Sequence, residues 1–174
     1  QTLVESPAIA LVSATGSTRM GREVGPTVAR RFGKRILELG GNNAMIVTPA
    51  ADLDLALRAI LFSAVGTAGQ RCTTLRRLIV HRSAKEVLIN KLLQAYSTLR
   101  VGNPLLKTTL VGPLTDHQAG EAMRAAINAA RQQGGKLLIG GERVLQQEFP
   151  DAFYINPAIV EMPQQTAIVR AETF

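Results

Sequence analysis

Two side chains in the first half of the sequence could together perform covalent chemistry: the thiol of Cys72, which is the only cysteine, and the carboxylate of Glu38. The thiolate is the reactive form of cysteine, so a nucleophilic cysteine needs a base or a positive environment that lowers the cost of ionising it. Glu38 could be that base. Positive charge near the thiol comes from three arginines, Arg71, Arg76 and Arg77. The pattern predicts a covalent catalyst with Cys72 as its nucleophile.

The elements around these two residues are expected to bring them to one end of a parallel sheet. Glu38 and Cys72 are 34 residues apart, which is about the length of one strand, helix and loop. The apolar segment 35–39 predicts a strand that is buried on both faces. Glu38 stands near its carboxyl end, where open α/β sheets bind ligands, and Leu37 and Leu39 should partly desolvate it.

A glycine-containing turn lies upstream of this strand. The apolar run 9–12, the polar residues 13–17 and the helix-compatible stretch 20–31 indicate a strand, a turn and a helix. Unpaired N–H groups and the helix dipole favour a phosphate at such a helix N-terminus. The segment from Gly16 to Gly21 therefore predicts an anion-binding turn.

The rest of the chain continues the alternation of strands and helices. Strands are predicted at 43–47, 77–80, 137–139 and within 154–160, and helices at 52–65, from Ser83 to about Thr98, and from Thr115 to Gly134. Ser83 with Glu86, and Thr115 with Gln118, have the spacing of a capping box. The alternation predicts an α/β fold with a mostly parallel sheet and flanking helices.

Composition narrows the functional classes. The 174 residues are 46% hydrophobic, enough for one core or for parts of two. No apolar run approaches the roughly 18 to 20 residues of a membrane span, and the N-terminus has no signal-peptide pattern. One cysteine cannot form an internal disulfide, which fits a reducing compartment, and we expect a cytoplasmic location without a membrane partner.

The net charge of +7 is concentrated in residues 1–90, where 12 Lys and Arg stand against 6 Asp and Glu. Proteins that read nucleic acid by base stacking place aromatic residues among their basic ones. The whole chain has only seven Phe and Tyr, and Phe32 is the only one of them within the clusters at 19–22 and 30–35. We therefore expect no nucleic-acid partner, and an anionic ligand for a minority of these charges.

The motifs together resemble the aldehyde dehydrogenase family. Four landmarks occur in the family's order: the turn from Gly16 to Gly21, Glu38, Cys72, and the segment Glu172-Thr173-Phe174. Segments 38–44 and 66–74 are most similar to the α-aminoadipic semialdehyde dehydrogenase, or antiquitin-like, group. Each motif alone is weak evidence for the family, whereas four motifs in the family's order and with compatible spacing are specific to it. The chain is identified as an internal piece of such an enzyme.

The resemblance implies a role for each landmark. Cys72 would attack an aldehyde or semialdehyde to form a thiohemiacetal and then a thioester, and Glu38 would be the general base. The resemblance implies NAD or NADP as the cofactor, with NAD favoured. The sequence leaves the choice between the two open, because the family's determinant for the adenosine ribose lies upstream of Gln1. Its binding residues would be Gly16, Ser17, Thr18, Gly21, Leu39 (through its carbonyl), Glu172 and Phe174.

The resemblance also implies an organisation. Residues 1–40 would be the end of a Rossmann-like nucleotide-binding domain and 41–174 the first part of the catalytic domain. The parent enzyme would be a homo-oligomer, a dimer or a tetramer. The family's second oxyanion donor, an Asn side chain, lies in a region that this chain lacks, so we expect the 174 residues alone to be inactive.

Several alternatives remain open at this stage. Arg71 could receive the distal carboxylate of a semialdehyde, or it could only tune Cys72 or pair with an acid. The chain could instead be a thiol hydrolase or acyltransferase that pairs Cys72 with a histidine, or a binding or assembly module with an incomplete site. His81 and His117 are predicted to be surface or capping residues, and no Cys, His and Asp spacing predicts a metal site.

Overall fold

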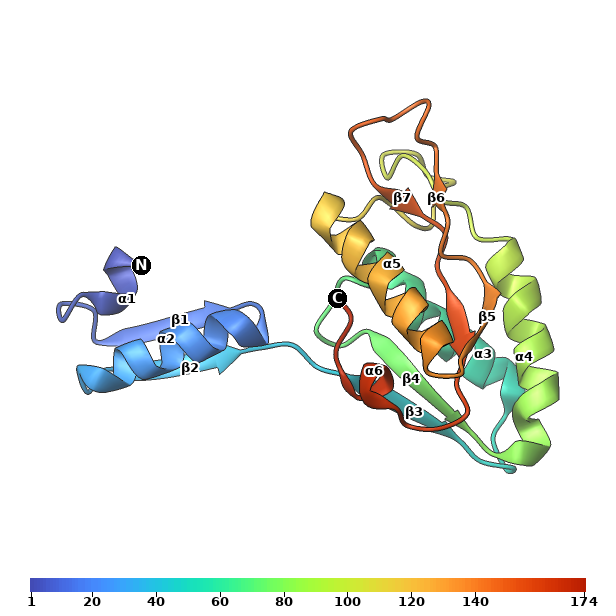
Figure 1. The fold of residues 1–174 in the computed structure, drawn as a ribbon, viewed down its shortest axis with the longest axis horizontal. Coiled ribbons are helices and arrows are strands. Elements are labelled where there is room, and N and C mark those ends of the chain that lie inside the picture. Colours follow the sequence, from blue (N-terminus) through green and yellow to red (C-terminus); the bar gives the residue numbers. More distant parts are fainter. The chain divides into compact units, whose positions relative to one another are not determined.

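The computed structural model describes residues 1–174 and divides them into two compact units, Gln1–Gly41 and Asn42–Phe174 (Figure 1). The first unit contains α1 (Thr2–Glu5), β1 (Leu11–Thr15), α2 (Thr18–Arg30) and β2 (Lys34–Glu38). The second contains β3 (Asn43–Val47), α3 (Leu53–Val65), the 3-10 turn η1 (Gly66–Gly69), β4 (Leu75–Val80), α4 (Arg82–Ser97), α5 (His117–Gln132), β5 (Lys136–Ile139), β6 (Arg143–Val144), β7 (Tyr154–Ile155), β8 (Ile159–Glu161) and α6 (Ala167–Arg170).

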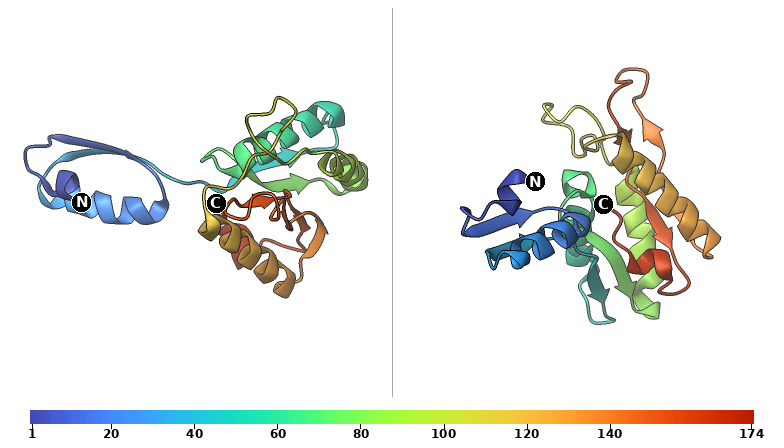
Figure 2. Two further views of the ribbon diagram at one scale, coloured as in Figure 1. Left: turned by 90° about the horizontal axis from the view of Figure 1, so that it is seen from above. Right: turned by 60° about the vertical axis from the view of Figure 1, so that its left-hand side comes forward.

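The first unit is a strand–helix–strand motif. β1 and β2 run parallel, and their register pairs Leu11 with Lys34 and Thr15 with Glu38. α2 connects them and lies along one face of the ladder (Figure 2), where Val28 is fully buried. The other face is open, because no second helix covers it, and Ile36 is 51% exposed. The prediction that segment 35–39 is buried on both faces is therefore wrong for this chain.

The second unit repeats the strand–helix–strand pattern with β3, α3 and β4. The two strands are parallel, and α3 packs against β4 and α4. The core of this unit contains Val47 of β3, Ile60 of α3, and Leu88 and Leu92 of α4. α3 begins where expected, because the Asp52 carboxylate accepts hydrogen bonds from the first backbone N–H groups of the helix.

Two short antiparallel pairs, β5 with β8 and β6 with β7, complete the second unit. α5 packs against β5 and α6 (Figures 1 and 2). The predicted α/β class is confirmed, and both longer ladders are parallel. No helix in the structure has the length and apolar character needed to cross a bilayer.

The N-termini of α4 and α5 differ from the prediction. His81 caps α4, because its Nδ1 accepts from the Ser83 N–H at 3.2 Å. Asp116 caps α5 through a 2.8 Å hydrogen bond from the Ala119 N–H. The capping boxes expected at Ser83 and Thr115 are wrong, since a neighbouring acceptor side chain takes the cap position in each case. The prediction that His81 is a capping residue is confirmed.

Candidate active site

The glycine-containing turn and Glu38 lie together at the carboxyl ends of β1 and β2. The Gly16 N–H donates to the Glu38 carbonyl at 3.0 Å, which extends the parallel ladder by one bond. Ser17 caps α2, because its Oγ accepts from the Met20 N–H at 3.1 Å. Ser17 and Thr18 are exposed, so the first N–H groups of this helix are accessible. Such a helix N-terminus suits a phosphate.

Gly21 permits a close approach between α2 and the end of β2. A Cβ atom at this buried glycine would lie 2.5 Å from Cδ1 of Leu39, closer than real Cβ contacts allow. The last glycine of a nucleotide-binding turn commonly has this role in helix–strand packing. Gly21 thus lets Leu39 pack closely against α2, the helix that begins at the turn.

Glu38 is exposed in this structure. The expected partial desolvation by Leu37 and Leu39 is wrong for the chain as it stands. The physical reason is that side chains alternate along a strand, and the face of β2 that carries Glu38 has no covering layer. The carboxylate is consequently accessible to water and to small molecules.

Cys72 occupies a four-residue turn between η1 and β4. The Thr74 N–H donates to the Arg71 carbonyl at 3.1 Å, and the Arg71 N–H donates to Thr74 Oγ1 at 3.1 Å. Thr74 is buried, with 3% exposure, whereas the Cys72 thiol is exposed. The bonds that close the turn use neither the Cys72 thiol nor the Cys72 N–H.

The backbone before the turn is strained. Thr67, Ala68 and Gly69 have φ values of 56°, 54° and 74°, a left-handed run that a β-branched residue such as Thr67 rarely adopts. For the non-glycine residues Thr67 and Ala68 this conformation costs about 1–3 kcal/mol each and persists only where the surroundings hold it. The run turns the chain sharply between the end of α3 and Cys72.

The side-chain amides of Asn43 and Gln70 form hydrogen bonds that stabilise the region of the Cys72 turn. Asn43 Nδ2 donates to the carbonyls of Cys72 at 2.7 Å and Thr74 at 3.0 Å. Gln70 Oε1 accepts from the Thr115 N–H at 2.7 Å. Neither amide is among the residues predicted for the site, although Asn43 lies inside the motif at 38–44 and Gln70 inside the motif at 66–74. Their position within these motifs is the sequence signal that indicates them.

Arg71 is turned toward the end of α3. Its Nη2 donates to the Phe62 carbonyl at 2.8 Å, and its guanidinium lies 5.1 Å from the centre of the Phe62 ring. A cation at the last carbonyls of a helix is favoured by the helix dipole. The side chain therefore has a structural partner in this structure, and its contact with a substrate carboxylate stays a prediction.

Glu172 and Phe174 are brought to the Cys72 loop by Arg76, on β4. Nη2 of Arg76 lies 3.6 Å from Oε1 of Glu172, and the two side chains are 11% and 22% exposed. The Arg76 guanidinium also lies 5.3 Å from the centre of the Phe174 ring. Burial lowers the pKa of Arg76 below its usual value, and the Glu172 carboxylate opposes that shift. The sequence alone indicates for Arg76 only a positive charge near the thiol.

The two histidines have structural partners. His81 caps α4, and His117 begins α5, where its ring meets Phe153 edge to face at 5.0 Å and lies 3.8 Å from Glu121. No group of three or more His, Cys, Asp and Glu side chains is placed to hold a metal ion. Nothing in these contacts favours a cysteine–histidine hydrolase.

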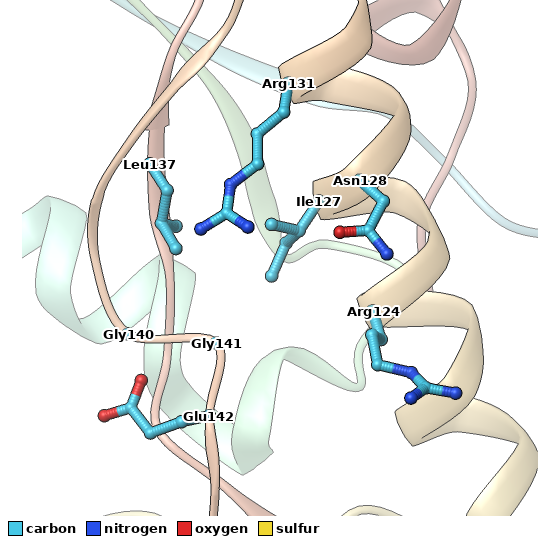
Figure 3. Close-up of a pocket in the computed structure, with 8 residues that line it drawn as sticks. All are labelled: Arg124, Ile127, Asn128, Arg131, Leu137, Gly140, Gly141 and Glu142. Atoms are coloured by element: carbon cyan, nitrogen blue, oxygen red, sulfur yellow. The ribbon is translucent and has the colours of Figure 1, made fainter.

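A cavity of about 320 Å³ lies elsewhere in the second unit, beside α5 (Figure 3). Ile127 and Arg131 extend from α5 toward Leu137, and the Gly140–Gly141 turn forms its floor. None of the predicted site residues lines it. It adds no nucleophile or base to the candidate site.

Comparison with known proteins agrees over the whole chain. A sequence model described as the aldehyde dehydrogenase family matches residues 1–174. Aldehyde dehydrogenase family 7 member A1 of Pisum sativum is 48% identical over 166 residues, which are 95% of this chain and 32% of that protein. Alpha-aminoadipic semialdehyde dehydrogenase of Mus musculus is 45% identical over 174 residues, 99% of this chain and 32% of the relative. The predicted similarity to the antiquitin-like group is confirmed.

Solved structures give the same result. Betaine aldehyde dehydrogenase of Staphylococcus aureus, in complex with NAD+, superposes with a TM-score of 0.92 at 25% identity and covers 98% of this chain and 34% of its own. An NADP-dependent enzyme of E. coli gives 0.90 at 33% identity, with 98% and 35% covered. The chain spans about a third of the length of the curated relatives that it matches. On this agreement of sequence and fold, the chain belongs to the aldehyde dehydrogenase family.

Proposed function

We propose that this chain is the central, nucleophile-bearing part of an NAD(P)-dependent aldehyde dehydrogenase. The observation that carries the proposal is the exposed Cys72 thiol on a turn that is held by Asn43 and joined through Arg76 to the Glu172–Phe174 segment. Residues 1–40 would belong to the nucleotide-binding domain and 41–174 to the catalytic domain. A cytoplasmic homo-oligomer, dimer or tetramer, is part of the same proposal.

The proposed reaction begins with the Cys72 thiolate. Its sulfur bonds to the aldehyde carbon to form a thiohemiacetal, and the Cys72 N–H would donate to the developing oxyanion. A bound nicotinamide cofactor would supply the acceptor for the hydride of this carbon, which would leave a thioester to Cys72. Glu38 then takes a proton from water, the water oxygen attacks the thioester carbon, and the carboxylate product leaves while Cys72 is restored.

The residues fit the two halves of a nicotinamide nucleotide. The N-terminus of α2, with Ser17 and Thr18 next to Gly16, would offer N–H groups for phosphate oxygens. The Glu172 carboxylate would accept hydrogen bonds from ribose hydroxyls. Phe174 would lie against the nicotinamide ring and the Leu39 carbonyl would accept from its carboxamide. NAD is favoured over NADP, and titration of the intact enzyme with each cofactor distinguishes them.

The proposal is tested by following cofactor reduction with α-aminoadipic semialdehyde. We expect the intact enzyme to form one reduced cofactor for each carboxylate produced, and the isolated 174-residue chain to form none. Loss of one oxyanion donor alone costs roughly 10²- to 10³-fold, and incomplete cofactor contacts add to that cost because they no longer position the ring. Turnover by the isolated chain near ordinary enzyme rates would show that its site is complete and contradict this expectation.

Arg71 is proposed to select semialdehydes by binding their distal carboxylate. In the intact enzyme, Arg71→Ala should lower kcat/KM roughly 10- to 100-fold for a carboxylated semialdehyde, as expected for losing a charge-assisted hydrogen bond. A neutral aldehyde of equal length should be much less affected. Phe62→Leu is the matched control, because it removes the ring beside Arg71 and keeps the guanidinium. Equal losses for both substrates would assign Arg71 to loop structure alone.

A further inference from the structure

Arg76 contacts the backbone of the nucleophile loop directly. Its Nη2 donates to the Arg71 carbonyl at 3.3 Å, and its Nη1 donates to the Gly69 carbonyl at 3.5 Å. These carbonyls lie just before Cys72, between the left-handed run and the turn. The guanidinium is therefore anchored to the segment before Cys72, whose turn Asn43 and Thr74 hold independently of Arg76.

The same guanidinium meets Glu172 and Phe174, which lie at the far end of the sequence. One nearly buried side chain thus contacts both segments. A guanidinium suits this task, because it presents five N–H donors in a rigid plane and stacks on aromatic faces. A lysine ammonium could not satisfy all four partners with one geometry.

A carboxylate can accept several hydrogen bonds at once, so pairing with Arg76 does not by itself exclude a ligand at Glu172. The 3.6 Å contact with Arg76 is made at Oε1. Because the pair is partly desolvated, removal of Arg76 would take a compensating charge away from the carboxylate. Arg76 is therefore one of the groups that fix the place of Glu172 relative to the Cys72 loop.

We propose that Arg76 is a positioning residue of the nicotinamide subsite, which holds the Glu172 carboxylate and the Phe174 ring in register with the Cys72 loop. The inference rests on the proposed function, because it assigns Arg76 to the cofactor half of that site. It predicts that Arg76 acts on cofactor affinity through Glu172, and acts little on the reactivity of the free thiol.

The test uses the intact enzyme with four variants: Arg76→Met, Arg76→Lys, Glu172→Gln and the double variant Arg76→Met/Glu172→Gln. Arg82→Met is the matched control, because Arg82 is an exposed arginine at the start of α4 and its loss removes the same charge. Cofactor affinity is measured by the fluorescence of bound NADH, KM is measured for both substrates, and Cys72 reactivity by the rate of iodoacetamide alkylation without cofactor.

Arg76→Met should weaken NADH binding and raise the cofactor KM about tenfold, the effect of losing one charge-assisted contact. The aldehyde KM and the alkylation rate should stay near their original values, and Arg82→Met should change none of them. Arg76→Lys should fall between the original enzyme and Arg76→Met, and it replaces Arg76→Met if that variant does not fold. The double variant should bind NADH no more weakly than Glu172→Gln alone, because the two residues act as a unit.

Two results would overturn the inference. The first is that the losses of NADH affinity in Arg76→Met and Glu172→Gln add in the double variant. The second is that the alkylation rate of Arg76→Met falls as much as its cofactor affinity. Either result would show that Arg76 supports the loop in general. These outcomes differ from a failure of the proposed function, which would appear as an original enzyme that reduces no cofactor with any aldehyde. The NADH titration decides the Arg76 inference even in that case, and an original enzyme that binds no NADH would overturn both.

Discussion

Replacing Cys72 with alanine in the intact enzyme should abolish aldehyde oxidation without disturbing the fold. The thiol is exposed on a turn, so its removal opens no cavity, and the hydrogen bonds that close the turn use other atoms. No other cysteine in the chain can replace it. Loss of an essential nucleophile lowers turnover by roughly 10⁴- to 10⁶-fold. The rate of cofactor reduction under saturating substrate measures this loss.

The matched control is Thr73→Ala, which changes the adjacent exposed residue of the same turn and keeps the thiol. Thr73→Ala should retain turnover of the same order, and Cys72→Ala should retain its NADH affinity and its unfolding temperature. Aldehyde oxidation above a trace by a folded Cys72→Ala protein would exclude Cys72 as the nucleophile. A parallel loss of NADH affinity would instead indicate that the substitution disturbed the loop.

The sequence predicts well those elements whose signals are local. β3 spans 43–47 as predicted, and α3 lies between its Asp52 cap and Gly66. The helix stripe that contains Leu88 and Leu92 is buried. Hydrophobic periodicity, an N-cap acceptor and a terminal glycine act over a few residues, so these features can be recognised without knowledge of the partner surfaces.

Features that depend on tertiary contacts could not be predicted in this way. The left-handed conformations of Thr67 and Ala68 contradict their ordinary preferences and exist because the surrounding loop holds them. The double hydrogen bond of Asn43 and the contacts of Arg76 join segments that are distant in sequence. The residue types of two distant segments do not show which of their residues come into contact.

β2 shows the same limit for burial. Its apolar residues correctly predict a strand, yet an apolar sequence reports only what could be buried. In this chain the ladder has two strands and one covering helix, so Ile36 and Glu38 remain exposed. The position of Glu38 at the strand end, beside the Gly16 N–H, was predictable from parallel topology, whereas its environment was not.

Glu38→Gln should slow steady-state turnover of the intact enzyme by roughly 10²- to 10⁴-fold, the usual effect of losing a general base. Glutamine preserves the length of the side chain, and the Glu38 carbonyl that accepts from Gly16 is backbone, so the turn should keep its geometry. An amide cannot take a proton from water. The loss should therefore fall mainly on hydrolysis of the thioester at Cys72.

Rapid mixing separates this step from the earlier ones. If Glu38 serves deacylation, the Glu38→Gln enzyme should release reduced cofactor in a burst close to the enzyme concentration and then turn over slowly, because acylation precedes the impaired step. Glu23→Gln, at an exposed carboxylate on α2, is the matched control and should keep the original rate. Unchanged turnover of Glu38→Gln across neutral pH would contradict the role of Glu38. A slow phase without a burst would move that role to activation of the Cys72 thiol, since the first chemical step would then be the one that needs the carboxylate.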